Sequence, residues 1–312
     1  MSSQVNSRDT ADRDDALDLG ALVYMVWSAK WIIGGLVVAA TVAAVVVSLM
    51  LPNIYRAEAL LAPSPEDGTR AAASQYSGLA SLAGISLPTE SGDKAVLGIE
   101  ILKSRKFITG FIGRHELLVP LVAASGWDPA SGELEIDSDV YDTASGEWVR
   151  EADPPRQSRP SDQEAYEIFR EQLTVSRDDD TGFVTVSFEH YSPTVARDWV
   201  DWLVRDLNET IRQRDVSDAE QAIAFLNEQL SRTSLAELRA VLFRLIEEQT
   251  KTVVLANVAD EYLFETIDPA VVPEKKSRPD RVLIVIASAF VAGLLGLLIA
   301  LVRGSRQRPS AD

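Results

Sequence analysis

Side chains of the types that carry nucleophilic, acid–base or metal-binding chemistry are few in this sequence, apart from carboxylates. The chain holds two histidines, His115 and His190, and no cysteine. Imidazoles and thiolates are common general bases, nucleophiles and metal ligands near neutral pH. A P-loop, a dinucleotide-binding fingerprint, HExxH and G-x-S-x-G are all missing from the chain. His190 ends a predicted strand and is interpreted as an ordinary surface histidine. The sequence therefore predicts no enzyme activity.

Carboxylates are numerous, with 47 Asp and Glu against 30 Lys and Arg. The run Asp178-Asp179-Asp180 resembles a cation site only superficially, because it lies in a predicted hairpin turn, where aspartates favour turn geometry and solvent. No pair of acids stands out as a pair that could cut a glycosidic bond. The excess negative charge also argues against nucleic-acid binding, which needs basic residues to neutralise phosphates. We expect no metal ion, no cofactor and no nucleic-acid partner.

Four small residues near the C-terminus form a pattern that indicates a helix–helix contact. Ala289, Ala292, Gly293 and Gly296 make two small-xxx-small pairs within an apolar block. In lipid, small residues let two helix backbones approach closely, and packing then drives association. The alternative is that Gly and Ala are simply common in membrane helices. We expect a genuine contact, whether within the chain, between protomers or with a partner protein.

The small residues belong to one of two uncharged blocks, 31–51 and 282–302, of about 21 residues each. A helix of that length spans roughly 30 Å, the hydrocarbon thickness of a bilayer. A buried helix of a soluble protein would usually keep some polar positions over such a length. Thirty residues with several aspartates precede the first block, and no small-x-small cleavage site follows it, so we expect a retained anchor and not a signal peptide. Both blocks are predicted to span a membrane.

Two spans place both termini on the same side of the membrane. Basic residues near the span ends do not decide the orientation, but long loops translocate largely regardless of charge. We therefore expect residues 1–30 and 303–312 to be cytoplasmic segments and residues 52–281 to form a periplasmic domain.

Strand patterns occur near both ends of this central segment. Residues 53–63 follow the first span as a predicted strand, and residues 262–267 form a final strand before the second span. Between them, 173–176 and 183–188 alternate as a hairpin around an Asp-Thr-Gly turn. Pairing of the final strand with the first would fix the two spans at one base.

A long helical region, about 193–260, lies between the hairpin and the final strand. Ser192-Pro193 supplies an N-cap and a proline at the first helical position. Apolar residues then step by three and four in two stripes that are out of phase across Ser231–Ser234, where a capping box restarts the pattern. We expect a helical hairpin with an ascending helix of about 40 residues; the alternative is one continuous helix. The predicted fold class is α+β, with two transmembrane helices flanking a periplasmic α/β base domain that carries a long helical hairpin arm.

These segments together resemble the polysaccharide co-polymerase, or chain-length determinant (Wzz-type), family over nearly the whole chain. Its most specific element is the proline-rich entry into the second span, formed by Pro269, Pro273 and Pro279 and followed by Gly293 and Gly296. Further matching segments are 18–31, 51–57, 79–84, 100–105 and 191–215.

The resemblance implies a homo-oligomer in the bacterial inner membrane that sets the modal length of a lipid-linked glycan without catalysing glycosidic bonds. Its expected partners are further copies of itself and an integral-membrane polysaccharide polymerase, with the lipid-linked glycan as a further candidate. Only Gly304–Asp312 follow Arg303, so the tyrosine kinase of the capsule branch is not expected in the same chain. An O-antigen type of regulator is favoured, with the small-residue face packed on the polymerase or a neighbouring span.

Two other classes of protein remain as alternatives. A two-span periplasmic sensor or receptor would need a cytoplasmic signalling module, for which the tails are short. An export adaptor also uses helical hairpins, but the two spans and the Pro/Gly pattern weigh against it.

Overall fold

The computed structural model describes residues 30–64, 90–233 and 235–306. It divides into two compact units, Asn53–Arg278 and a second one that combines Met1–Pro52 with Pro279–Asp312. Most of the predicted N-terminal segment 1–30 and of the tail 303–312 lies outside the described residues, as do Ser234 and the 79–84 segment.

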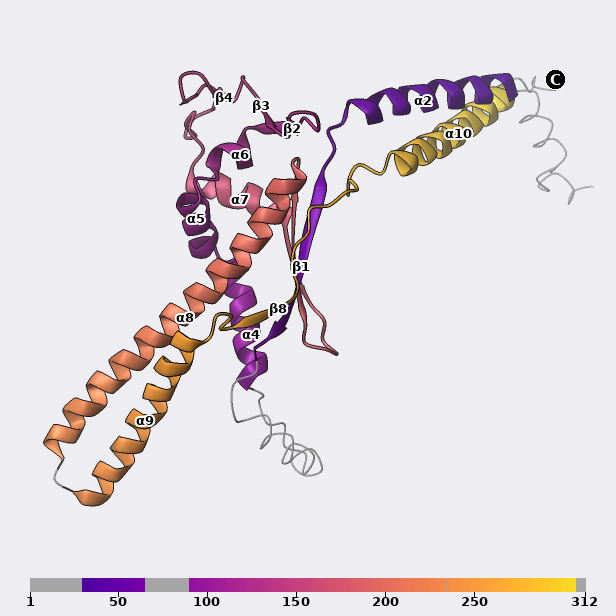
Figure 1. The fold of residues 1–312 in the computed structure, drawn as a ribbon. Helices are drawn as coiled ribbons and strands as arrows, with labels where there is room; N and C mark the ends of the chain where they lie inside the picture. The colour runs from indigo at the N-terminus through magenta and orange to yellow at the C-terminus, as the bar shows by residue number, and fades with distance from the viewer. Residues whose placement is uncertain (1–29, 65–89, 234, 307–312) are drawn as a thin grey trace, which may run out of the picture. The chain divides into compact units, whose positions relative to one another are not determined.

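A four-stranded antiparallel sheet lies at the centre of the Asn53–Arg278 unit, in the order β6-β7-β1-β8 (Figure 1). The strands are β6 (Leu173–Arg177), β7 (Val184–His190), β1 (Tyr55–Pro63) and β8 (Phe264–Asp268). β6 and β7 form the predicted hairpin, and β1 pairs with β8, so Pro63 lies opposite Phe264. Both predicted strand pairings are therefore confirmed.

The sheet buries one face because its side chains alternate. Val184, Val186 and Phe188 of β7 point inward, next to Ala57 and Leu61 of β1, and all five are buried. Arg56 and Glu58 of β1, which alternate with the buried Ala57 and Ala59, are exposed.

Helices cover the buried face. They are α4 (Glu90–Lys103), α5 (Arg105–Arg114), α6 (Leu118–Val122), α7 (Asp162–Gln172) and α8 (Pro193–Arg232). α7 begins at the capping box predicted from the sequence, since Ser161 Oγ accepts from the Glu164 N–H at 3.2 Å and Glu164 Oε2 accepts from the Ser161 N–H at 2.9 Å. Short strand pairs join α6 to α7, namely β2 (Ala124–Trp127) with β3 (Leu134–Ile136) and β4 (Tyr141–Asp142) with β5 (Glu147–Trp148).

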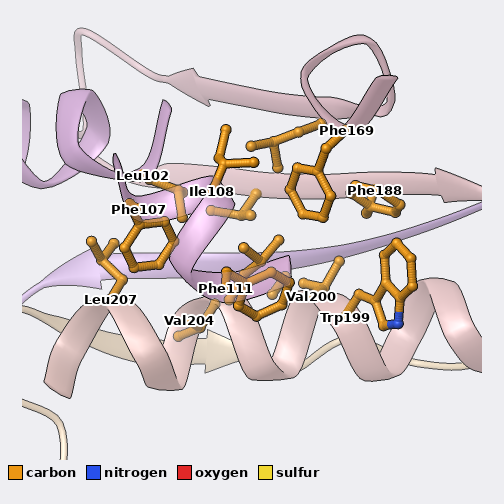
Figure 2. Packing of buried hydrophobic residues seen from close by; sticks show 14 of the residues in the cluster. Leu102, Phe107, Ile108, Phe111, Phe169, Phe188, Trp199, Val200, Val204 and Leu207 are labelled. Carbon is orange, nitrogen blue, oxygen red and sulfur yellow. The ribbon is translucent and has the colours of Figure 1, made fainter. Parts of the chain in front are cut away.

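Aromatic rings fill the space between the helices and the sheet. Figure 2 shows Trp199 of α8 on one side of the core, with Phe169 of α7 and Phe188 of β7 opposite it. The ring centroid of Phe188 lies 4.7 Å from that of Phe169 and 5.1 Å from that of Trp199, and Phe111 of α5 packs on Phe169 at 5.6 Å. Large buried rings of this kind contribute much of the free energy of folding, so this cluster fixes α8 to the sheet.

α8 continues far beyond the sheet and pairs with α9 (Ala236–Val258) as a helical hairpin (Figure 1). It has 40 residues and begins as predicted, with Ser192 Oγ accepting from the Val195 N–H at 3.4 Å and with Pro193 at its first turn. The predicted hairpin arm is confirmed, and the alternative of one continuous helix is wrong. α9 starts without a side-chain cap at its N-cap residue, Leu235.

The interpretation of His190 as a surface histidine is wrong. Its side chain is 3% exposed, because the alternation of β7 turns it inward with Val186 and Phe188. The Pro120 carbonyl can only accept, so His190 Nε2 donates to it at 3.0 Å, and Nδ1 accepts from the Ser192 N–H at 3.1 Å. The imidazole is therefore neutral, and burial lowers its pKa.

This neutral imidazole predicts a loss of stability in acid. Below about pH 6.5 the unfolded chain protonates His190 whereas the folded chain does not, so the free energy of unfolding falls by up to about 1.4 kcal/mol per pH unit. We expect His190→Phe, although less stable overall, to lose less stability than wild type between about pH 7.5 and about pH 5.5. Urea unfolding of the full chain in detergent, followed by tryptophan fluorescence, measures both slopes. Equal slopes would show that another group causes the acid sensitivity.

Among the described residues, the second unit contains the helices α2 (Lys30–Met50) and α10 (Arg281–Arg306). Both are long and apolar enough to cross a membrane over the windows Ile33–Met50 and Arg281–Ala300. Only 6% and 11% of these windows is buried, whereas the core helix of a soluble protein would be mostly buried. Helices thus occupy both predicted blocks, and their length and apolar composition suit membrane-spanning helices.

Candidate functional site

The small-residue face of α10 lies against α2 of the same chain. Ala292 and Gly296 are buried, while Ala289 and Gly293 are partly buried at the margin of the contact. A Cβ atom added to Gly296 would lie 3.2 Å from Ile33 Cα, so only glycine allows the two backbones this approach. The predicted contact of this face with a polymerase or a second protomer stays a prediction.

At the same interface, a side chain is accommodated more easily at Gly293 than at Gly296. A Cβ atom at Gly293 would meet only Val37 Cγ2, at 3.9 Å, which is an ordinary van der Waals contact. Because Gly296 lies beside Ile33 and Gly293 beside Val37, the two helices run antiparallel.

The matching face on α2 was not identified from the sequence. Ala40 and Ala44 are partly buried and Ser48 is buried. These three small residues recur every four positions, which is the same signal as on α10. That spacing in the first block marks α2 as a candidate partner for the small-residue face of α10.

The proline-rich segment connects β8 to α10 without forming a helix. Pro269 is exposed and Pro273 partly buried in the Asn53–Arg278 unit, and Pro279 belongs to the other unit. The segment is held at its far end by a β-bridge between Ile54 and Arg278, where the Ile54 N–H donates to the Arg278 carbonyl at 3.0 Å. Since proline fixes φ and removes the N–H donor, these residues favour an extended connection, and they do not converge on one site.

A polar cleft of about 620 Å³ lies between α8 and the residues around β8. Asp201, Arg205, Glu209 and Arg212 line it from α8, and Tyr262 lines the opposite side. Partial burial raises the pKa of Asp201, and the charge of Asp198 adds to this shift. The lining can donate and accept hydrogen bonds. On the sequence, a polar stripe spaced by three and four is the ordinary solvated face of a helix, so nothing marked this cleft in advance.

The other histidine has a structural role. His115 Nε2 lies 2.9 Å from Asp206 Oδ2, and Arg114 Nη1 donates to the same oxygen at 2.6 Å. The His115 ring stacks on Trp202 with centroids 4.8 Å apart. These contacts join the end of α5 to α8, whereas His190 lies at the end of β7, so the two imidazoles do not meet in one site.

The aspartate run at 178–180 forms the predicted turn. Asp178 Oδ1 accepts from the Asp180 and Thr181 N–H groups at 2.9 and 2.8 Å, and these hydrogen bonds lower the pKa of Asp178. Within the described ranges, no group of three His, Asp or Glu side chains is arranged to hold a metal ion.

Comparison with known proteins adds family evidence. Residues 15–114 match the family model described as "Wzz: Chain length determinant protein". No curated protein matches the chain. Two similar solved structures are a "full-length bacterial polysaccharide co-polymerase", with 13% identity and a TM-score of 0.39 over 96% of this chain and 100% of that chain, and a "Fragment of WzzB, Polysaccharide Co-polymerase from Salmonella Typhimurium", with 12% identity and a TM-score of 0.32 over 72% and 100%.

Both TM-scores are too low to establish a common fold, so the family evidence is the match at residues 15–114. It spans α2, β1, α4 and α5, the part of the chain that leads from the first apolar helix into the base of the central unit. This match confirms that the protein resembles the chain-length determinant family.

Proposed function

We propose that this membrane protein sets the modal chain length of a surface polysaccharide of the O-antigen type. The family match at residues 15–114 carries the proposal and supports a chain-length determinant role. Proteins of that family are regulators and not enzymes, and we propose the same for this chain. Its partner is an integral-membrane polymerase that builds a lipid-linked glycan.

The proposed topology places both termini in the cytoplasm and residues 52–281 in the periplasm, with spans at 31–51 and 282–302. The two long apolar helices, one before and one after the central unit in the sequence, support this arrangement in the bacterial inner membrane. The arm then belongs to the periplasmic domain.

The protein acts as a homo-oligomer in this proposal. Exposed apolar residues on α9 support it, because a soluble arm gains free energy by covering such a surface. The exposed fraction reaches 75% at Val258. The others are Leu238, Val241, Phe243, Leu245 and Val254 on this helix and Leu235 at its N-cap.

Chain-length control then follows from tethering. The oligomer holds the polymerase and the growing glycan together, so that each added unit competes with release. The modal length reflects the ratio of addition to release, and removal of the tether leaves the polymerase active but without a preferred length.

Deletion of the gene tests this function. We expect the modal band of the surface polysaccharide to disappear on a gel, while polymerisation continues with short, randomly distributed lengths. Without the tether, the growing chain is released after a random number of additions. The wild-type gene supplied in trans should restore the band. An unchanged ladder in the deletion strain contradicts the proposal and favours a two-span sensor or an export adaptor, which lost signalling or blocked efflux would identify.

A further inference from the structure

A short basic segment lies at the end of the Asn53–Arg278 unit. Lys275, Lys276 and Arg278 fall within four residues and all three are exposed, in a chain whose net charge is −17. The acids next to them in the sequence are Glu274 and Asp280. Most surfaces of so acidic a protein repel anions, and this segment is an exception.

One acidic residue of the fold, Glu189, neutralises one of these three cations. Arg278 Nε lies 3.4 Å from Glu189 Oε2, and Ser277 Oγ lies 3.3 Å from Glu189 Oε1. Glu189 is thus already engaged. Neither Lys275 nor Lys276 forms an ion pair with any residue in the described ranges. Two ammonium groups therefore remain available to an external anion.

The backbone of this segment is held in place. The Ser277 N–H donates to the Ile54 carbonyl at 2.7 Å, and the Ile54 N–H donates to the Arg278 carbonyl at 3.0 Å. This bridge follows directly after Lys276 and joins the segment to the chain just before β1. A fixed backbone presents the two lysines together and lowers the entropy cost of binding.

The sequence places the segment at the membrane surface. α10 begins at Arg281, and the uncharged block 282–302 follows. Four residues separate Lys276 from Arg281, and an extended chain spans this interval in less than about 20 Å. Long cationic side chains at that distance from an apolar span reach the lipid headgroups. On the proposed periplasmic side, basic residues oppose the usual charge bias of membrane proteins, which indicates that they have a specific use.

We propose that Lys275 and Lys276, flanked by Arg278, bind the phosphate of an anionic lipid at the membrane surface. An ammonium group donates charge-assisted hydrogen bonds to phosphate oxygens and suits this ligand as a point charge. Two lipids carry the required group: a phospholipid such as phosphatidylglycerol, and a polyprenyl pyrophosphate of the kind that carries a growing glycan. The binding does not depend on the chain-length role, and its test reads affinity and not glycan length.

The experiment titrates the detergent-solubilised full chain with each lipid and measures occupancy by native mass spectrometry. We expect Lys275→Gln/Lys276→Gln to weaken binding roughly thirtyfold, since each basic residue near a membrane surface contributes about a fivefold factor. Added salt should weaken the wild-type affinity, because it screens exposed charges. Both lysines are exposed, so the double substitution should leave the unfolding transition unchanged.

The matched control is Arg239→Gln/Lys251→Gln, which removes two positive charges from exposed positions on α9. It should change the affinity less than about twofold. Tighter binding of the polyprenyl pyrophosphate than of phosphatidylglycerol supports the site and identifies the glycan carrier as its source, and equal affinities support it with bulk phospholipid as the source. Wild-type affinity for both lipids in the lysine variant, or an equal loss in the control, overturns the proposal.

Discussion

Asn208→Ala is expected to lower the free energy of unfolding of the Asn53–Arg278 unit by about 3 kcal/mol. Asn208 is buried on α8, and its side chain makes three hydrogen bonds to the chain around β8. Oδ1 accepts from the Leu263 and Phe264 N–H groups at 2.8 and 2.9 Å, and Nδ2 donates to the Phe264 carbonyl at 3.0 Å. Alanine removes all three at once and leaves buried backbone groups without partners, which is far costlier than losing an exposed hydrogen bond.

Urea unfolding of the full chain in detergent, followed by the fluorescence of Trp199 and Trp202 on the same helix, measures this loss. Asn257→Ala is the control, because this exposed amide donates only to the Val253 carbonyl within α9, and it should cost less than about 0.5 kcal/mol. Asn208→Asp should be as damaging as alanine, since a carboxylate oxygen would then face the Phe264 carbonyl. Equal unfolding midpoints for wild type and Asn208→Ala would mean that water replaces the amide and that this link is dispensable.

Elements with local signals could be predicted from the sequence. The capping box at Ser161, the Ser192-Pro193 start of α8 and the turn at Asp178 each rest on residues within three or four positions of one another. The change in phase of the apolar stripe across Ser231–Ser234 is also a local pattern, and it predicted the helical hairpin. Hydrogen bonds between near neighbours depend little on the rest of the fold.

Buried polar residues could not be predicted, because their partners are distant in the sequence. In the sequence, Asn208 and Asp206 of α8 look like ordinary solvated polar residues. In the fold, Asn208 hydrogen-bonds to the chain at the start of β8, and Asp206 hydrogen-bonds to His115. His190 was interpreted as a surface residue because its side chain is polar. The alternation of side-chain direction along β7 could have placed it inward with Val186 and Phe188. The polar cleft lacked a signal for the same reason, since it needs both α8 and the residues around β8.

The small-residue face lies between these cases. Its spacing indicated a helix–helix contact but could not identify the other helix, because lipid, a second protomer and a second span all accept such a face. The structure supplies Ile33 and Val37 of α2 as neighbours and shows that the two glycines differ. A bulky substitution at Gly296 is therefore expected to have a larger effect than one at Gly293.

Gly296→Leu is expected to separate α2 from α10 and to abolish the modal polysaccharide band. The added Cβ would lie 3.2 Å from Ile33 Cα and 3.3 Å from both Cγ atoms of that residue. A backbone atom cannot rotate away, so the helices must move apart, and overpacking of this kind typically costs about 1–3 kcal/mol. The chain has no cysteine, so Val37→Cys with Gly293→Cys provides a disulfide probe of the helix pair. We expect Gly296→Leu to slow cross-linking of this probe roughly tenfold.

Gly34→Leu is the matched control on α2, because its Cβ would meet nothing within 4 Å and the residue is exposed. It should leave the cross-linking rate unchanged. Normal cross-linking in Gly296→Leu would contradict the claim that the close approach of the two backbones at Gly296 requires glycine. Lost cross-linking with an unchanged modal band would instead show that the helix pair is not needed for length control. If Gly34→Leu alone alters the band, the exposed face of α2 contacts the polymerase or a second protomer. The contact with a partner protein would then be made by α2 and not by α10.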